Sequence, residues 1–346
     1  MDFVHSGAGL GLSLVAAVVP TILHVLFVRW LDRYEKEPLT LAAGAFLWGS
    51  VPAVALSIIA ELVLGLPFSG EGCTQFCTIV QSAAIAPIVE EVVKAIALLG
   101  LVLFFRDEFD GVLDGVIYGT LVGFGFAMTE NFLYFIGSFT EGGWDGLWTT
   151  VILRSGAFGL THAFFSGLVG AGFGFAIGAK PGSPRHAIPM VALAGAIGFH
   201  ALHNFGVSIA AESPLGLGLA VLNYITGVLL LTIIVIWSLV QEKKWIVNEL
   251  QDEIGVTITQ GEYDLITRKR YLAARKAGPL ARMGGRRVSF LAELTRLAME
   301  LAIKKHQVSA GNDSRALRAS LERVRTQIID LRQLAAETLV DPFQEV

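Results

Sequence analysis

Residues 86–99 read APIVEEVVKAIALL, with Glu90, Glu91 and Lys94 inside an apolar run that extends from 79 to 105. A helix of about 20 residues crosses the hydrocarbon core of a membrane, so this run is long enough to span it with the three charges near mid-depth. An ionisable side chain there costs ~2.5–3.5 kcal/mol on insertion scales and usually faces a protein interior or a water-filled cavity. The stretch therefore predicts a membrane protein with a polar functional site inside the bilayer.

The composition of the whole chain agrees with a membrane protein. Of its 346 residues, 53% are hydrophobic and 16% are charged, and the mean hydropathy is +0.62. Six more apolar stretches are long enough to span: 8–28, 40–65, 112–136, 148–179, 188–211 and 216–240. Hydrocarbon offers no partner to an unsatisfied backbone group, so these spans should be helices. The sequence predicts an all-α polytopic membrane helix bundle with about seven transmembrane helices.

The charges divide the chain into two parts. Residues 1–240 carry 8 Lys/Arg and 16 Asp/Glu, whereas residues 241–346 carry 18 and 14. The second part lacks long apolar runs and shows the periodicity of amphipathic helices, for example over 287–306 and 314–339. We therefore expect a transmembrane domain over 1–240 and a cytoplasmic helical tail over 241–346. The basic tail suits a surface beside anionic lipid headgroups, and the total charge of −4 gives no reason to expect a nucleic-acid partner.

The basic residues also predict the orientation. They follow the odd-numbered spans, as Arg29, Arg33 and Lys36, then Arg106, then Lys180 and Arg185, then Lys243 and Lys244. The loops around 66–78, 137–147 and 212–215 contain no Lys or Arg. By the positive-inside rule the N-terminus lies outside and the C-terminus in the cytoplasm. The first ten residues also lack Lys and Arg, so the first span is expected to be a retained helix and not a signal peptide.

The two cysteines, Cys73 and Cys77, fall in the first outward loop. On the oxidising side of a membrane a disulfide can persist. The sequence leaves both a disulfide and two free thiols open.

Further candidate site residues, all but one of them polar, lie in the next three spans. They are Phe126, Glu130 and Asn131 in GFGFAMTENFLY, His162 in GLTHAFFSGLVG, and His200, His203 and Asn204 in GFHALHNFG. Glu90 and Lys94 are four residues apart and share a helix face, so we expect these two to pair while Glu91 points about 100° away. Asp114 and Glu61 lie near span ends and are expected at the membrane interfaces.

This set of residue types suits the hydrolysis of a peptide bond. Such hydrolysis needs a water, a base, a donor for the oxyanion and an acid for the leaving amine. Paired glutamates, two histidines and an asparagine can supply these roles. The sequence has no HExxH helix, no paired transmembrane aspartates with GxGD and no GxSG serine with a histidine partner, which argues against three other classes of intramembrane protease.

Several motifs together resemble those of the PrsW family. They are EEVVK (90–94), FAMTEN (126–131), His162 in the fifth span, HALHN (200–204) and DRYEKEP (32–38) after the first span. The chain is similar over about residues 20–240, and more distantly resembles the CAAX prenyl proteases and bacteriocin-processing proteases. The resemblance implies Glu90 and Glu91 as the catalytic pair and His162 and His200 as essential histidines. The supporting residues are then Lys94, Phe126, Glu130, Asn131, His203 and Asn204.

The resemblance further implies an intramembrane endopeptidase in a bacterial-type plasma membrane. Its substrate would be a membrane-anchored protein such as an anti-sigma factor, cleaved in a stress-signalling cascade. Glu91, His162 and His200 could bind Zn²⁺ with an open position for water. A glutamate-activated water without any metal fits the same residues, and both alternatives stay open.

Two other functions are compatible with the same residues. Chains of membrane Glu and His also relay protons in proton-coupled transporters and channels, although no inverted repeat is visible in the spans. Alternatively, the chain is a non-enzymatic membrane scaffold whose polar residues lock helices together. The scaffold predicts that Glu90→Ala and Glu91→Ala cost stability and leave function intact.

Overall fold

The computed structural model describes residues 3–32, 36–70, 72–106, 108–179, 185–267, 285–309 and 315–338, which form helices and no strand. They belong to two compact units, one of Met1–Asp32 with Glu37–Ile236 and one of Arg33–Lys36 with Trp237–Val346. The predicted all-α helix bundle is confirmed. Arg33 and Lys180, which entered the orientation argument, and residues 33–35 of the DRYEKEP motif lie outside the described residues.

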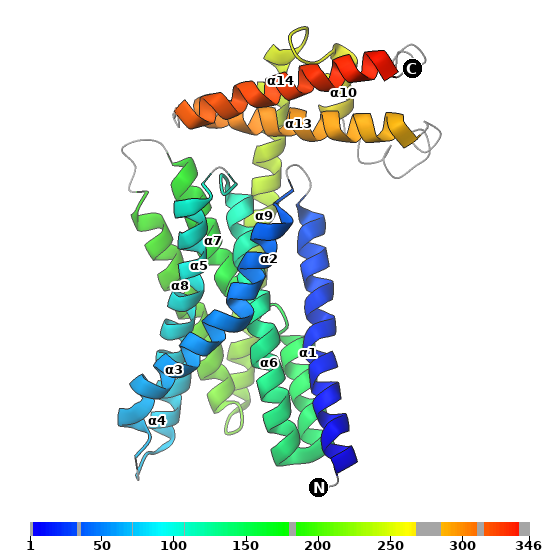
Figure 1. Cartoon of the computed structure of the whole chain (residues 1–346). Coiled ribbons are helices and arrows are strands. Elements are labelled where there is room, and N and C mark those ends of the chain that lie inside the picture. Colours follow the sequence, from blue (N-terminus) through cyan, green and yellow to red (C-terminus); the bar gives the residue numbers. More distant parts are fainter. Residues whose placement is uncertain are drawn as a thin grey trace. The chain divides into compact units, whose positions relative to one another are not determined.

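The first unit is built from long apolar helices (Figure 1). Its first half contains α1 Phe3–Leu31, α2 Leu39–Trp48, η1 Gly49–Ala53, α3 Val54–Gly65, η2 Leu66–Phe68, α4 Gln75–Val80, η3 Gln81–Ile85 and α5 Ala86–Phe104. Its second half contains α6 Val112–Val151, η4 Ile152–Ala157, α7 Thr161–Gly178, α8 Ala187–Ile209 and α9 Pro214–Glu249, which continues into the second unit. The segments η1, η3 and η4 are π-helical turns.

Among the described residues, five helical stretches are long and apolar enough to cross a membrane. They are Gly7–Leu31, Leu39–Phe68, Val112–Gly178, Ala187–Ile209 and Pro214–Glu253. The third stretch contains both predicted spans 112–136 and 148–179. The predicted span 79–105 is helical but carries Glu90, Glu91 and Lys94 and is not among the five. The count of seven transmembrane helices therefore stays a prediction.

A sharp turn inside α6 replaces the loop predicted over 137–147. Residues on both sides of Gly143 are helical, and Gly143 has φ 62° and ψ −146°, a conformation that side chains with a Cβ rarely adopt. Thr150 Oγ1 donates to Ser138 Oγ at 2.7 Å across the turn. The loop was the stretch left between the apolar runs 112–136 and 148–179, but one glycine is enough to reverse the chain.

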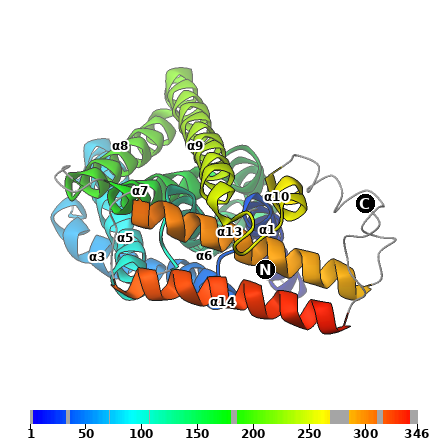
Figure 2. The same cartoon turned by 90° about the horizontal axis from the view of Figure 1, so that it is seen from above.

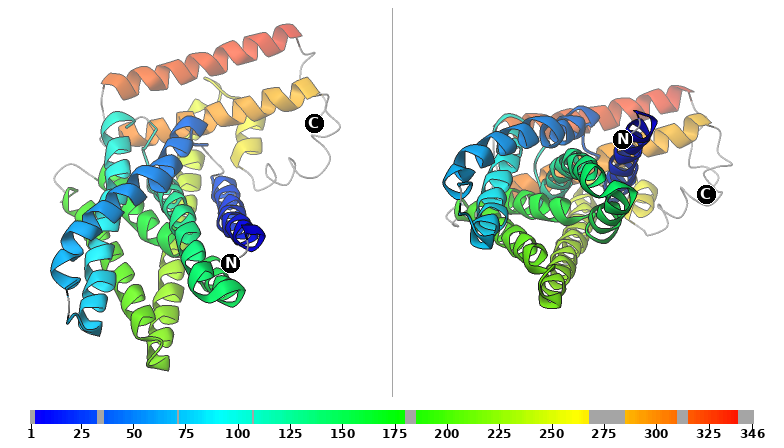
Figure 3. Two further views of the ribbon diagram at one scale, coloured as in Figure 1. Left: turned by 60° about the horizontal axis from the view of Figure 1, so that its bottom comes forward. Right: turned by 90° about the horizontal axis from the view of Figure 1, so that it is seen from below.

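The helices α6 and α7 form the centre of the first unit. Of the most apolar window in Val112–Gly178, 67% is buried, compared with 22% in each of the other four stretches. Figure 3 shows α1, α2 and α8 arranged around this pair. Large apolar side chains on the surrounding helices, such as Leu23, Leu62 and Ile233, are exposed. Such a surface is what a hydrocarbon solvent requires.

Cys73 and Cys77 are joined by a disulfide, with 5.7 Å between their Cα atoms. The structure thus contains the first of the two alternatives that the sequence left open. The bridge joins Cys73, which precedes α4, to Cys77 in the first turn of α4.

The second unit contains the end of α9, η5 Gln251–Glu253, α10 Gln260–Thr267, α13 Gly285–Ser309 and α14 Arg315–Thr338. Figures 1 and 2 show α13 and α14 side by side. Their apolar faces pack with α9 around a core that includes Leu250, Leu294, Leu301 and Ile328. The two predicted amphipathic helices are present, except that residues 314 and 339 lie outside the described chain. The cytoplasmic position of this unit stays a prediction.

Candidate active site

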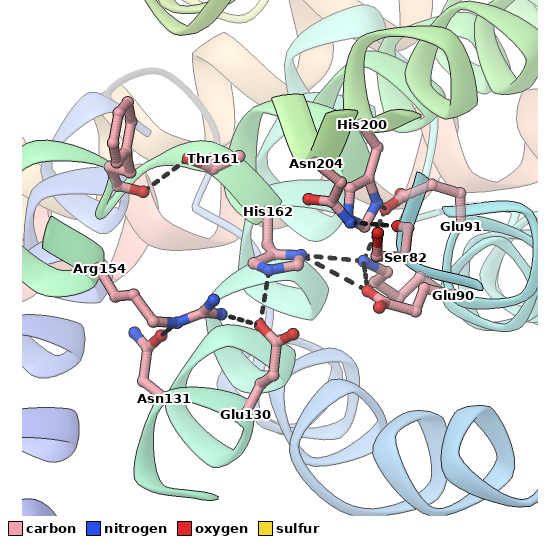
Figure 4. Close-up of polar contacts among 12 residues, drawn as sticks. Ser82, Glu90, Glu91, Glu130, Asn131, Arg154, Thr161, His162, His200 and Asn204 are labelled. Atoms are coloured by element: carbon pink, nitrogen blue, oxygen red, sulfur yellow. Dashed lines mark hydrogen bonds and ion pairs between the residues drawn. The ribbon is translucent and has the colours of Figure 1, made fainter. Parts of the chain in front are cut away.

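The four side chains expected to form the site lie together in the first unit (Figure 4). Glu90 and Glu91 come from α5, His162 from α7 and His200 from α8, and all four are buried. One nitrogen or oxygen atom from each lies within 4.8 Å of the others. Residues separated by up to 110 positions in the sequence thus form one compact group.

Lys94 lies among these side chains. Its Nζ is 2.7 Å from Glu91 Oε1, 3.3 Å from Glu90 Oε2 and 3.1 Å from His162 Nδ1. The ammonium also lies 4.1 Å from the ring centroid of Phe126. The expected pair of Lys94 with Glu90 is therefore present. Lys94 also pairs with Glu91, because residues three apart are neighbours on a helix too and the long lysine side chain reaches both carboxylates.

Both ring nitrogens of His162 contact charged side chains. Its Nε2 is 2.8 Å from Glu130 Oε2, and since a carboxylate only accepts hydrogen bonds, Nε2 carries the proton. Its Nδ1 then accepts from Lys94 Nζ and lies 3.8 Å from Glu90 Oε2. The ring orientation is thus fixed by two charged groups.

Arg154, in η4, contacts Glu130, the carboxylate that accepts from His162 Nε2. Its Nη2 donates to Glu130 Oε2, its Nε donates to Asn131 Oδ1 at 2.7 Å, and its guanidinium lies 3.9 Å from the centroid of the Tyr134 ring. Arg154 was not among the predicted site residues, although it lies inside the predicted span 148–179. The signal that identifies it as a site residue is the one applied to Glu90: a charge well inside an apolar segment is costly.

His200 and its neighbours on α8 make different contacts. His200 Nδ1 is 2.9 Å from Glu91 Oε1. Asn204 Nδ2 donates to the backbone carbonyl of Ser82 at 2.8 Å. His203 packs against Phe158, with 4.8 Å between ring centroids, and its buried Nδ1 has no hydrogen-bond partner among the described residues.

The backbone carbonyl of Ser82 accepts a hydrogen bond from Asn204 because Pro87 has no N–H to donate. In the π-helical turn η3 the N–H of Ala86 bonds to Gln81, so the next N–H in this register would reach Ser82. That next residue is Pro87, which has no N–H. The carbonyl left free must find another partner inside a membrane, and Asn204 supplies it.

A cavity of about 470 Å³ opens beside the cluster. Glu90, Glu130, Arg154, His162 and His200 line it, together with His203, Asn204 and Asn131. Glu91 and Lys94 are absent from this lining and are almost completely buried. Glu61, which was expected at an interface, also lines the cavity. The two adjacent glutamates therefore differ: Glu90 lines the cavity, and Glu91 does not.

Gly123 allows α6 to approach α7 at the site. A Cβ at this position would overlap the backbone carbonyl of His162. A larger residue would therefore push α7, and with it His162, away from α6.

The donor types of the cluster fit a zinc ion. Two carboxylates and two imidazoles are common Zn²⁺ ligands. Glu91 Oε2 is buried and has no hydrogen-bond partner among the described residues, so one strong acceptor is available. Glu130 behind His162 is the kind of second partner that orients a metal-binding histidine.

Comparison with known proteins agrees with the resemblance. A family model described as PrsW family intramembrane metalloprotease matches residues 37–239, which include every candidate site residue. The chain is 33% identical over 118 residues to the Protease PrsW of Clostridioides difficile (strain 630), covering 34% of this chain and 48% of that protein. It is 30% identical over 163 residues to the Protease PrsW of Geobacillus kaustophilus (strain HTA426), covering 47% and 66%.

A third relative is the Protease PrsW of Bacillus subtilis (strain 168), 30% identical over 126 residues that cover 36% of this chain and 55% of that protein. The chain thus spans about half to two thirds of the length of these curated relatives. No solved structure matches the chain.

Proposed function

The chain belongs to the PrsW family of intramembrane metalloproteases, and we propose that it hydrolyses peptide bonds of membrane-anchored protein substrates at the Glu/His cluster. One observation carries this proposal. Glu90, Glu91, His162 and His200 have ligand-type atoms within 4.8 Å of one another, beside a cavity enclosed by apolar helices. Since each buried charge in a membrane is costly, such a group is expected to serve a function.

In the proposed reaction Glu90 is the general base, because it is the glutamate that lines the cavity. Its carboxylate takes a proton from a water, and the water oxygen bonds to the carbonyl carbon of the scissile peptide. The carbonyl electron pair moves to oxygen. When the tetrahedral species collapses, the C–N bond breaks and Glu90 returns the proton to the leaving amine. The products are one carboxyl and one amine terminus.

The other residues hold this reaction in place. Glu91 binds His200 and Lys94, and Glu130 holds His162. Asn204 has two amide N–H groups, and one remains for the oxyanion after the bond to Ser82. A donor aimed at an oxyanion in a water-poor site contributes about 2.7–4 kcal/mol. We therefore propose Asn204 as the oxyanion donor.

Residues Glu91, His162 and His200 would hold a zinc ion, as the family description suggests. When bound, such an ion acts as a Lewis acid that polarises the scissile carbonyl. Glu90 then keeps its role as the base. The steps assigned above to this chain's own residues are the same with and without the ion.

The proposal includes a direction of access. The cavity lining continues to Ser138, Thr150, Ala210 and Leu217, which adjoin the Gly143 turn and the connection between α8 and α9. The predicted outward loops contain no Lys or Arg, so the positive-inside rule favours this end as the outer one. We propose a bacterial-type plasma membrane, an N-terminus outside, and a single-span substrate of the anti-sigma-factor kind cleaved near the outer surface.

Cleavage of a tethered substrate by the purified full-length protein tests the proposal. The wild type, reconstituted in lipid vesicles with single-span substrates, should produce a defined new N-terminus that mass spectrometry identifies. Glu91→Gln, His162→Ala and His200→Ala should remain folded and lose cleavage. Matched controls are Glu141→Gln and His186→Ala, whose side chains are exposed. Cleavage retained in any two of the three site variants contradicts the proposal.

A further inference from the structure

The ammonium of Lys94 occupies the place where the donors of the active site converge. Its three N–H groups face three acceptors, Glu90 Oε2, Glu91 Oε1 and His162 Nδ1, at 3.3, 2.7 and 3.1 Å. These are three of the four residues that could hold a metal ion. The lysine thus uses the one lone pair of His162 Nδ1 and one oxygen of each carboxylate, while Glu91 Oε2 has no hydrogen-bond partner among the described residues.

The surroundings of Lys94 fix the ammonium in this position. The residue is 1% exposed, and the Phe126 ring closes one side of the ammonium with a cation–π contact at 4.1 Å. A buried ammonium is costly unless it is paired and fully hydrogen-bonded, and here every donor has a partner.

A divalent ion and this ammonium cannot share the site. Zn²⁺ needs ligand atoms about 2.0–2.2 Å away, so an ion bound to Glu91 and His162 would lie within a few ångströms of Nζ. Like charges at that separation repel strongly in a buried environment. Binding of the ion therefore requires the ammonium to move away and to give up its hydrogen bonds.

We propose that Lys94 is a tethered cation that competes with divalent metal for the active-site donors and keeps the metal affinity of the wild-type protein low. The inference rests on the proposed function only in taking this cluster as the active site. It predicts a measurable property, the affinity for Zn²⁺, that does not depend on knowing a substrate.

Equilibrium dialysis of the full-length detergent-solubilised protein against buffered free Zn²⁺, with elemental analysis, measures this affinity. We expect Lys94→Met to bind one Zn²⁺ per chain at least about 100-fold more tightly than the wild type, because removing one partner of a buried ion pair leaves charges that a new cation would compensate. Lys94→Arg keeps the cation and should not gain affinity. Lys94→Met combined with Glu91→Gln should lose the gain.

If Lys94→Met is unstable without metal, the change in its Tm on addition of Zn²⁺ provides a second test. An ion that binds only the folded state stabilises it by mass action, so Zn²⁺ should raise the Tm of Lys94→Met more than that of the wild type. Equal Zn²⁺ affinity in the wild type and Lys94→Met overturns the proposal, as does an unstable Lys94→Met that Zn²⁺ does not stabilise. Loss of cleavage in Glu91→Gln concerns the proposed function alone, so the two failures are distinguishable.

Discussion

Two groups of buried acids in the first unit are stabilised in different ways. In the proposed active site, Glu90, Glu91 and Glu130 pair with the cations Lys94 and Arg154. Near the start of α2, Glu37 accepts from Tyr118 Oη at 2.5 Å and shares a hydrogen bond with Asp114. None of the described groups that perturb Glu37 is a cation.

This difference determines which of the two groups contains a carboxylate that can accept a proton from water. Burial and the neighbouring Asp114 carboxyl raise the pKa of Glu37 to about 12, so this side chain keeps its proton and acts as a hydrogen-bond donor. The acids of the cavity have charge-assisted bonds to cations instead. A carboxylate with such partners beside a cavity can take a proton from water, whereas a protonated one cannot.

The largest expected effect is that of Glu90→Gln. A general base contributes about 100-fold to 10,000-fold to the rate, so kcat for cleavage of the tethered substrate should fall by that factor while the protein stays folded. Glu37→Gln makes the same chemical change in the other group and should cleave at the wild-type rate. A Glu90→Gln protein that keeps more than one tenth of the wild-type kcat would show that another residue is the base.

Arg154→Met should have the next largest effect. Removing a group that orients a site histidine typically costs about 10–100-fold in activity, and Arg154 holds Glu130, which holds His162. We expect kcat to fall and KM to stay constant, with partial recovery in Arg154→Lys, which keeps the charge. A change confined to KM, with no recovery in Arg154→Lys, would instead indicate direct contact with the substrate.

Gly123→Val tests the helix contact that positions His162. The added side chain would overlap the His162 carbonyl, and overpacking of this kind destabilises by about 1–3 kcal/mol. Thermal unfolding should show a lower Tm, with reduced cleavage. Gly137→Val is the control on the same helix, because a Cβ there meets nothing within 4 Å. Equal Tm values for the two variants would mean that moving α7 away from α6 does not reduce the stability of the fold.

The smallest effect is expected for Glu37→Gln. Its carboxyl has a pKa of 4.5 as an unperturbed group and of about 12 in the folded protein. The folded state therefore binds the extra proton between these values, and stability falls as pH rises above 4.5. Glutamine removes this loss, so the Tm at pH 7.5 should rise by at least about 2 °C, with no rise at pH 4. A Tm gain of equal size at both pH values would refute the linkage.

The helical class and the members of the site could be predicted from the sequence, because both follow from the cost of placing polar groups in hydrocarbon. The apolar runs indicate the helices, and the same cost identifies Glu90, Glu91, His162 and His200. Their roles as catalytic residues stay a proposal. Arg154 lies inside the predicted span 148–179 and could have been identified by the same rule, but it was not among the predicted site residues.

Other features depend on geometry that the sequence pattern does not contain. The contact of Lys94 with Glu91 depends on the rotamers of long side chains. The position of Asn204 depends on a π-helical turn before Pro87, and the spacing of α6 and α7 depends on which glycines face each other. The helix reversal at Gly143 depends on one residue with a positive φ, which a count of apolar residues cannot distinguish from a loop.

Cleavage in H₂¹⁸O by the purified full-length protein in lipid vesicles tests the central claim most directly. If the Glu/His cluster activates water, the new C-terminal carboxyl of the substrate fragment gains one ¹⁸O with the wild type, and the fragment forms at least about 100-fold more slowly with Glu90→Gln. A folded wild-type protein that yields no fragment from any single-span substrate tested, or a fragment without ¹⁸O from a single turnover, would contradict the assignment of this site to peptide hydrolysis.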